Sequence, residues 1–120
     1  MQHEEHYTQV AFVNWFRLNY KKYIIFAVPN GEKRNLLTAI RLKKEGVLAG
    51  IPDLCILLSD GKFFFIEMKS VKGRLSKNQK DIIGFIEGLD HKVLIGYGID
   101  DAIKKTVNEI NKLIKIGNIK

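Results

Sequence analysis

The 120-residue chain has one cysteine, two prolines and no apolar run approaching the roughly 20 residues that cross a bilayer. A single cysteine excludes a disulfide framework, and Cys55 lies within an apolar segment, so we expect a small buried hydrophobe. The histidines show no metal-ligand spacing, which argues against a zinc site. Residues 1–6 lack a basic-then-apolar signal pattern. We therefore expect a cytoplasmic protein that is not secreted and has no membrane partner.

Hydrophobic residues make up 46% of the chain, which is enough for the core of one domain spanning residues 1–120. The net charge of +7 and the pI near 9.5 suit an anionic partner such as nucleic acid. Alternatively, the excess of basic residues has no functional meaning, because an AT-rich genome also favours Ile, Lys and Asn. The net charge therefore supports nucleic-acid binding only in combination with a site that acts on nucleic acid.

Apolar periodicity and turn signals divide the chain into alternating elements with short connections. We expect helices near residues 4–20, 33–45 and 76–89, a last helix capped by Asp100, and strands at 23–28 and 92–97. Between the second and third helices lies a hairpin. Gly46 is placed as a helix C-cap. The order α-β-α-β-β-α-β-α predicts a single-domain α/β protein with a mixed central sheet flanked by helices.

Charged residues stand at the open end of that hairpin. Pro52-Asp53 precedes the apolar run 54–58, an Asp60-Gly61 turn follows, and the run 63–66 leads into Glu67-Met68-Lys69. Glu67 and Lys69 are two residues apart and share one face of a strand. Two carboxylates and an ammonium therefore converge at one end of an apolar hairpin. Their burial costs free energy unless another group compensates them.

The hairpin register decides whether Asp53 and Glu67 share a face. A two-residue Asp60-Gly61 turn would place Asp53 opposite Met68 and on the wrong face relative to Glu67. We therefore predict a three-residue loop, a bulge, or a strand that bends at Pro52-Asp53 before regular pairing begins.

This cluster suits a divalent metal. Mg²⁺ prefers oxygen ligands, which Asp53, Glu67 and the backbone carbonyl of Met68 could supply. Lys69 would then hold or deprotonate the water that attacks phosphorus, or stabilise the developing charge. The alternative is a surface salt bridge worth roughly 0–1 kcal/mol.

Proline-aspartate, a hairpin and Glu-x-Lys resemble the PD-(D/E)xK nuclease pattern, and the surrounding residues are similar to its VRR-NUC branch, in its stand-alone viral and bacterial form. The resemblance implies a restriction-endonuclease-like fold and a Mg²⁺-dependent nuclease, with Mn²⁺ as a substitute, in a bacterial or phage-infected cell. It covers nearly the whole chain. The matching segments are 28–31 with Arg34, 39–42 with 45–46, 50–54, 66–69, and 72–76 with Gln79.

The resemblance also implies site roles. Asp53 and Glu67 match the metal carboxylates, and Lys69 matches the catalytic lysine. Glu5 matches a metal-binding glutamate on the first helix, with Glu4 as the rival; a solvated helix N-terminus explains either equally well. Gln79 matches a catalytic glutamine, although Ser76-x-x-Gln79 is also a capping box. Related nucleases often carry a tyrosine where this chain has Ile83, which argues against a tyrosine-assisted site.

Two basic groups could contact DNA. Asn30, Lys33 and Arg34 lie at a strand-to-helix junction, where backbone N–H groups can hold a phosphate; an Asn-Gly turn with a solvated helix start is the alternative. Lys72 and Arg74 follow the Glu-x-Lys strand, which places them near a scissile phosphate.

The predicted function is a metal-dependent endonuclease acting on branched DNA such as four-way junctions. Two symmetric cuts need two sites, so we expect a homodimer. One of Phe63, Phe64 and Phe65 is a candidate for its interface, because all three cannot face inward. The alternatives are an inactive nucleic-acid-binding module that partners a helicase or recombination protein, and a small basic structural protein.

Overall fold

The described chain alternates helices and strands in the order that the sequence predicts. The computed structural model describes residues 3–31 and 35–119, with the backbone alone for 115–119. Lys33 and Arg34 lie outside the described residues. The elements are α1 (His3–Asn19), β1 (Ile24–Ala27), α2 (Leu36–Lys44), β2 (Leu54–Leu57), β3 (Phe63–Lys69), α3 (Lys77–Gly88), β4 (Val93–Tyr97) and α4 (Ile99–Ile119).

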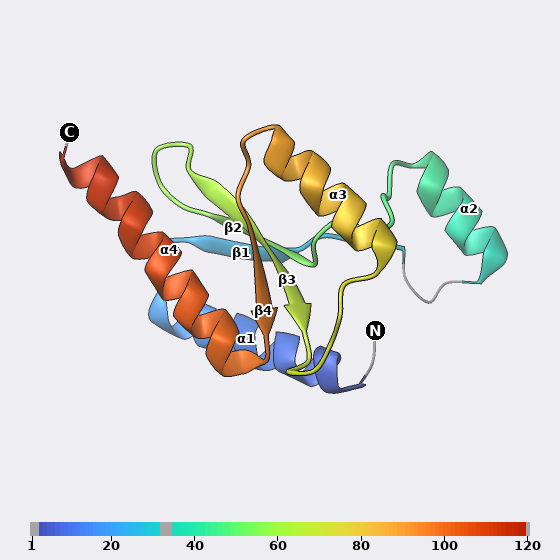
Figure 1. The fold of residues 1–120 in the computed structure, drawn as a ribbon, viewed down its shortest axis with the longest axis horizontal. Helices are drawn as coiled ribbons and strands as arrows, with labels where there is room; N and C mark the ends of the chain where they lie inside the picture. The colour runs from blue at the N-terminus through green and yellow to red at the C-terminus, as the bar shows by residue number, and fades with distance from the viewer. Residues whose placement is uncertain (1–2, 32–34, 120) are drawn as a thin grey trace.

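The four strands form one mixed sheet in the order β1-β2-β3-β4. β1 pairs with β2 and β2 with β3 in antiparallel fashion, whereas β3 and β4 are parallel. A parallel pair needs a crossover connection, and α3 supplies it. Helices flank the sheet (Figure 1), so the predicted α/β architecture with a mixed central sheet is confirmed.

One face of the sheet carries the hydrophobic core. Alternate residues of β3 point to this face and are fully buried, as strand periodicity requires. α1 and α4 cover them and contribute the aromatic and aliphatic side chains that fill the layer. The core residues on these elements are Phe12, Phe16, Phe64, Ile66, Met68, Ala102 and Ile110.

Gly96 lets α4 lie directly on the sheet. A Cβ at this position would stand 2.6 Å from Ala102 Cβ and 3.0 Å from Ala102 Cα. Ala102 is fully buried, so neither partner has room to move. Gly96 pairs with Met68, one residue before Lys69, and α4 therefore braces the strand that carries the charged cluster.

The hairpin has a three-residue loop, the first of the three alternatives that the sequence left open. Leu57 pairs with Phe63 and Leu54 with Ile66, and Leu58 N–H donates to Lys62 O at 2.8 Å. Residues 59–61 therefore form the loop, with positive φ at Asp60 and Gly61. Continuing this register by one residue places Asp53 opposite Glu67, and the two side chains share a face.

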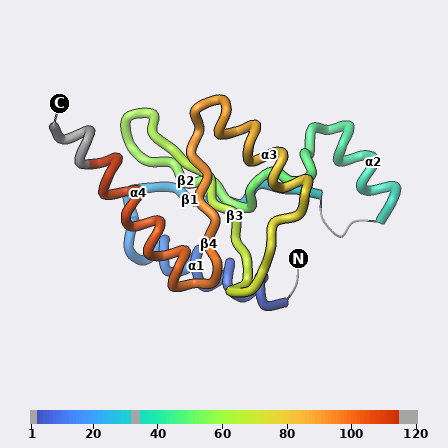
Figure 2. The backbone as a smooth tube through the Cα atoms, viewed as in Figure 1, coloured from blue at the N-terminus to red at the C-terminus, as the bar shows by residue number. Residues whose placement is uncertain are grey.

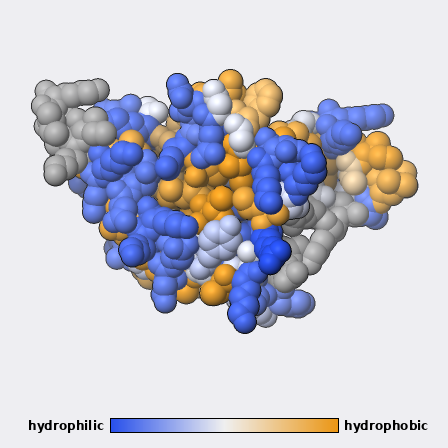
Figure 3. All heavy atoms as spheres, viewed as in Figure 1, coloured by the Kyte–Doolittle hydropathy of each residue, from blue (hydrophilic) through white to orange (hydrophobic). Residues whose placement is uncertain are grey.

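The other face of the sheet is only partly covered. Phe63 and Phe65 lie on it, half-buried, with ring centroids 5.8 Å apart, whereas Phe64 belongs to the core. Ile24, Phe26 and Leu57 share this face by register and are exposed. Hydrophobic side chains gather at the centre of the view, where the sheet lies between α3 and α4 (Figure 3).

The helix ends test the local predictions. Ser76 caps α3 through the predicted capping box, and Gly46 has the positive φ expected after α2. The prediction that Asp100 caps the last helix is wrong, because α4 already begins at Ile99. Instead, Asp101 Oδ2 accepts from Tyr97 N–H at 2.9 Å, since the tight turn at Gly98 brings that donor within reach.

α2 extends from the rest of the molecule. It has no buried residue, and Leu36, Leu37 and Ile40 are exposed on its surface. It lies at one end of the molecule, while the 59–61 loop lies at the opposite end (Figure 2). α2 thus flanks the side on which β1 ends and β2 begins.

Candidate active site

Asp53 and Glu67 meet where β2 begins and β3 ends. Only 5% of Asp53 and 1% of Glu67 is exposed, although both are acidic. The Asp53 backbone is held by β1, because Val28 N–H donates to Asp53 O at 2.8 Å. Acidic residues are rarely buried unless they have partners, so this pair requires specific compensation.

Within the described part of the chain, Met68 and Asn30 both donate to the Asp53 carboxylate. Met68 N–H donates to Oδ2 at 2.8 Å, and Asn30 Nδ2 donates to Oδ1 at 3.2 Å. Both oxygens therefore accept a hydrogen bond, one from the neighbouring strand and one from the loop after β1. Hydrogen bonds to the ionised form favour a charged carboxylate in a buried position.

Glu67 is held from two directions. Gln79 Nε2 donates to Glu67 Oε2 at 3.0 Å, and Lys69 Nζ lies 3.7 Å from the same oxygen. The Gln79 amide cannot turn freely, because its Oε1 accepts from Ser76 N–H at 2.9 Å. The capping box that begins α3 therefore also aims the Gln79 amide at Glu67. Gln79 thus forms the predicted capping box and also contacts Glu67, while its catalytic role stays a prediction.

The cluster offers carboxylate oxygens of the kind that bind a cation. Asp53 and Glu67 carry two negative charges and Lys69, with only 8% exposed, carries one positive charge. Among the described residues, neutral amides also donate to these carboxylates, and an amide orients a carboxylate without cancelling its charge. Hard divalent cations prefer such carboxylate oxygens, so the residues present fit a magnesium or manganese ion. The Met68 carbonyl stays a predicted third ligand.

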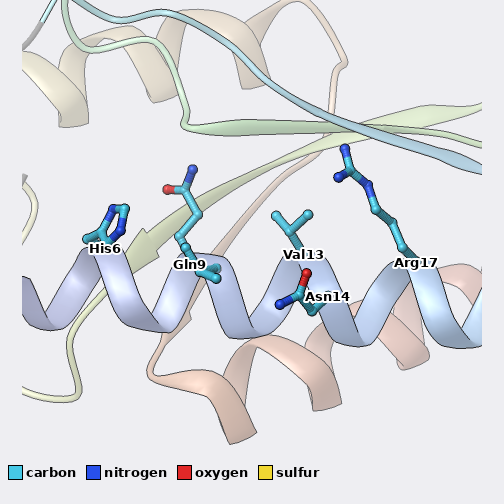
Figure 4. A pocket seen from close by; sticks show the side chains of 6 residues that line it. His6, Gln9, Val13, Asn14 and Arg17 are labelled. Carbon is cyan, nitrogen blue, oxygen red and sulfur yellow. The ribbon is translucent and has the colours of Figure 1, made fainter.

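Glu5 does not join the two carboxylates in one cluster. Across residues 3–31 and 35–119, no three His, Cys, Asp or Glu side chains are grouped so as to hold a metal. Glu5 is half-buried and Glu4 exposed in the first turn of α1. Four residues on, Gln9 points from α1 toward the strands, one turn along the helix from His6 (Figure 4). Gln9 Oε1 is buried and has no hydrogen-bond partner among the described groups.

The predicted DNA contacts divide into two groups. Lys72 and Arg74 are exposed on the loop between β3 and α3 and lie close in sequence to Lys69. A hydrogen bond from Gly73 N–H to Ser70 O, 2.9 Å long, forms the turn that presents them. Asn30 is half-buried, and its amide contacts Asp53. Sequence reasoning predicted a phosphate contact there and missed this hydrogen bond, which has no local pattern.

A groove adjoins the cluster. A cavity of about 590 Å³ separates α2 from the start of α3, and a smaller one of about 210 Å³ adjoins it beside Asn30 and Gln79. Gly50 has a φ of +88°, and a Cβ there would stand 2.8 Å from Asn78 Nδ2, so glycine lets the α3 N-terminus approach the Asp53 loop. The larger cavity is lined by Ala39, Leu42, Val47, Leu48, Asn78 and Ile82.

Two further sequence expectations concern what the protein does not do. Burial raises the pKa of the Cys55 thiol, so it is a poor nucleophile, and only 4% of the residue is exposed, as predicted. No helix among the described residues combines the length and apolarity needed to span a bilayer.

Comparisons with known proteins give the family and the fold of the chain. The model of the VRR-NUC domain family matches residues 1–98. A solved structure described as a VRR-NUC domain protein superposes with a TM-score of 0.71 at 23% identity, covering 90% of this chain and 88% of that one, and so shares its fold. No curated protein matches the chain. Because the family model spans most of the sequence, the chain belongs to the VRR-NUC family of nuclease-type domains.

Proposed function

We propose that this protein is a metal-dependent endonuclease that hydrolyses phosphodiester bonds in branched DNA, with four-way junctions as the preferred class. The observation that carries the proposal is the buried pair of carboxylates, Asp53 and Glu67, on one face of the sheet with Lys69 beside them. Burying three charges together is costly for stability alone, and functional sites are where such costs are retained.

Asp53 and Glu67 would hold Mg²⁺ or Mn²⁺, together with the Met68 carbonyl. Glu5, in the first turn of α1, stays a predicted further ligand. When bound, the ion lowers the pKa of a water molecule and offsets negative charge on the phosphate. Gln79 keeps the Glu67 carboxylate in place through its 3.0 Å hydrogen bond.

Lys69 acts on the attacking water or on the phosphate. Lys69 can hold the water in line with phosphorus and help to remove its proton, or its ammonium can stabilise the charge that develops on the phosphoryl oxygens. The water oxygen forms a bond to phosphorus while the bond to one sugar oxygen breaks, and the leaving oxygen takes a proton. Burial of Lys69 reduces its choice of conformations, which favours a single geometry for this step.

The DNA would lie across the basic side of the site. Lys72 and Arg74 are exposed beside the catalytic strand, and Lys33 and Arg34 stay predicted contacts of the loop before α2. A protein with a net charge of +7 releases counterions when it binds DNA, so its affinity should fall steeply with salt.

The proposal is tested by cleavage of a matched set of substrates in Mg²⁺ or Mn²⁺: four-way junction, flap, splayed arms and linear duplex of the same sequence. We expect the junction to be cut fastest, and no substrate to be cut in EDTA. Metal binding without any cleavage would favour the inactive module that partners a helicase or recombination protein. The absence of both would favour a basic structural protein.

A homodimer would supply the second cut. The sheet face that α1 and α4 leave open carries the exposed Ile24, Phe26 and Leu57 next to the half-buried Phe63 and Phe65. A second copy could cover this apolar surface and place two sites about a twofold axis.

Light scattering at micromolar concentration is expected to give twice the monomer mass of 13.8 kDa. Replacing Phe26 with Glu should yield a monomer, because a charge would then be buried in the interface. The matched control is Val71→Glu, at an exposed residue outside this face. A monomer mass for the wild type, with and without junction DNA, would exclude the dimer.

A further inference from the structure

We propose that Asn30 is a positioning residue that holds the Asp53 carboxylate in the orientation needed for metal binding. The inference rests on the proposed function and deepens it. Asn30 Nδ2 donates to Asp53 Oδ1 at 3.2 Å, between residues 23 positions apart. Sequence reasoning grouped Asn30 with residues that contact DNA through backbone N–H groups and basic side chains, and the structure shows its side chain in contact with a carboxylate.

The hydrogen bonds from Met68 and Asn30 reach different oxygens of the Asp53 carboxylate and therefore restrain it in different ways. Met68 N–H fixes Oδ2 from the neighbouring strand at 2.8 Å. One hydrogen bond allows a carboxylate to swing about the axis of that bond, and a second bond to the other oxygen removes this freedom. Asn30 supplies the second bond, and the Asp53 carboxylate then has a defined orientation.

The backbone before Asn30 is tied to the same residue. Val28 N–H donates to Asp53 O at 2.8 Å, so the main chain enters the loop in a fixed relation to Asp53. The ring of Pro29 then fixes the φ of that residue. Gly31, with a φ of +78°, turns the chain away from the site. The segment 28–31 is therefore anchored to Asp53 twice, once by backbone and once by side chain.

A neutral amide suits this role better than a basic side chain. An arginine or lysine at position 30 would also orient Asp53, but its charge would compete with the cation for the carboxylate. Gln79 does the same for Glu67 from α3, with its own orientation set by Ser76. Each carboxylate thus receives one side-chain amide, and the two amides come from elements on either side of the groove.

A positioning role for Asn30 and a contact between Asn30 and a DNA phosphate predict different losses when Asn30 is replaced. Replacing a positioning residue should weaken metal binding and lower kcat, because both depend on the direction of the Asp53 lone pairs. Replacing a phosphate contact should weaken DNA binding, raise KM and lower the salt dependence of binding by about one charge.

The experiment compares wild type with Asn30→Ala and Asn30→Leu; leucine preserves size without a donor. Mn²⁺ affinity is measured by calorimetry without DNA, junction affinity in EDTA, and kcat and KM with Mg²⁺. We expect each variant to lose about 10–100-fold in Mn²⁺ affinity and in kcat, at unchanged junction affinity. Asn78→Ala is the matched control, since this exposed amide lines the same groove and has no hydrogen bond to either carboxylate among the described contacts.

Thermal melts confirm that each variant is folded before it is compared. Wild-type Mn²⁺ affinity and kcat in both variants would overturn the inference, whether or not junction affinity changes. An equal loss in Asn78→Ala would also overturn it, because any amide of the groove would then suffice. A wild type that neither binds Mn²⁺ nor cleaves DNA would refute the proposed function itself, and the two failures are distinguished by the wild-type measurement.

Discussion

Glu67→Gln and Asp53→Ala are expected to abolish cleavage and to weaken metal binding while the fold persists. Each change removes a charged oxygen from the buried pair, and loss of one group that acts in the transition state costs on the order of 10²–10³-fold in rate. Glutamine preserves the size of Glu67, which is 1% exposed, and so avoids a cavity beside Gln79. Single-turnover cleavage of junction DNA and Mn²⁺ calorimetry measure the two effects.

The matched control for these variants is Asp81→Asn. Asp81 is a carboxylate on the exposed side of α3, where it pairs with Lys77 at 3.0 Å. An exposed pair of this kind contributes roughly 0–1 kcal/mol, so the variant should cleave and bind metal as wild type does. If Glu67→Gln cleaved at the wild-type rate, the assignment of the catalytic pair would be wrong.

Lys69→Ala is expected to abolish cleavage and to leave metal binding unchanged or slightly stronger. Loss of a positioned acid or base typically costs about 10²–10⁴-fold in rate. Metal affinity should not fall, because the ammonium lies 3.7 Å from Glu67 Oε2 and competes with a cation for that oxygen. Lys69→Arg should not restore activity, since a planar guanidinium does not fit a site with 8% exposure.

The comparison with Lys72→Ala distinguishes chemistry from DNA affinity. Lys72 is exposed on the following loop, so its removal should weaken junction binding and leave the single-turnover rate at saturating protein unchanged. Lys69→Ala should show the reverse pattern. Parallel loss of metal binding and cleavage in Lys69→Ala would show that Lys69 supports the structure of the site and not its chemistry.

Much of this fold follows from short-range signals in the sequence. The order of the eight elements, the α3 capping box and the glycine after α2 depend on residues a few positions apart, where periodicity and turn chemistry dominate. The sequence also showed that an unbulged two-residue turn would separate Asp53 and Glu67, and of the three remaining alternatives the structure has the three-residue loop. The Asp100 cap failed because Gly98 turned the chain earlier than the polar pattern suggests.

The sequence by itself determined which residues carry the charges of this site and that two of them share a strand face. Tertiary structure alone decided what holds them there. Asn30 lies 23 residues from Asp53, and Gln79 lies 12 residues from Glu67, so no local periodicity links them. Their meeting depends on strand pairing, on Gly50 admitting the start of α3, and on the capping box turning one amide. Long-range contacts of this kind follow from packing the whole chain, because each requires several elements to be in place at once.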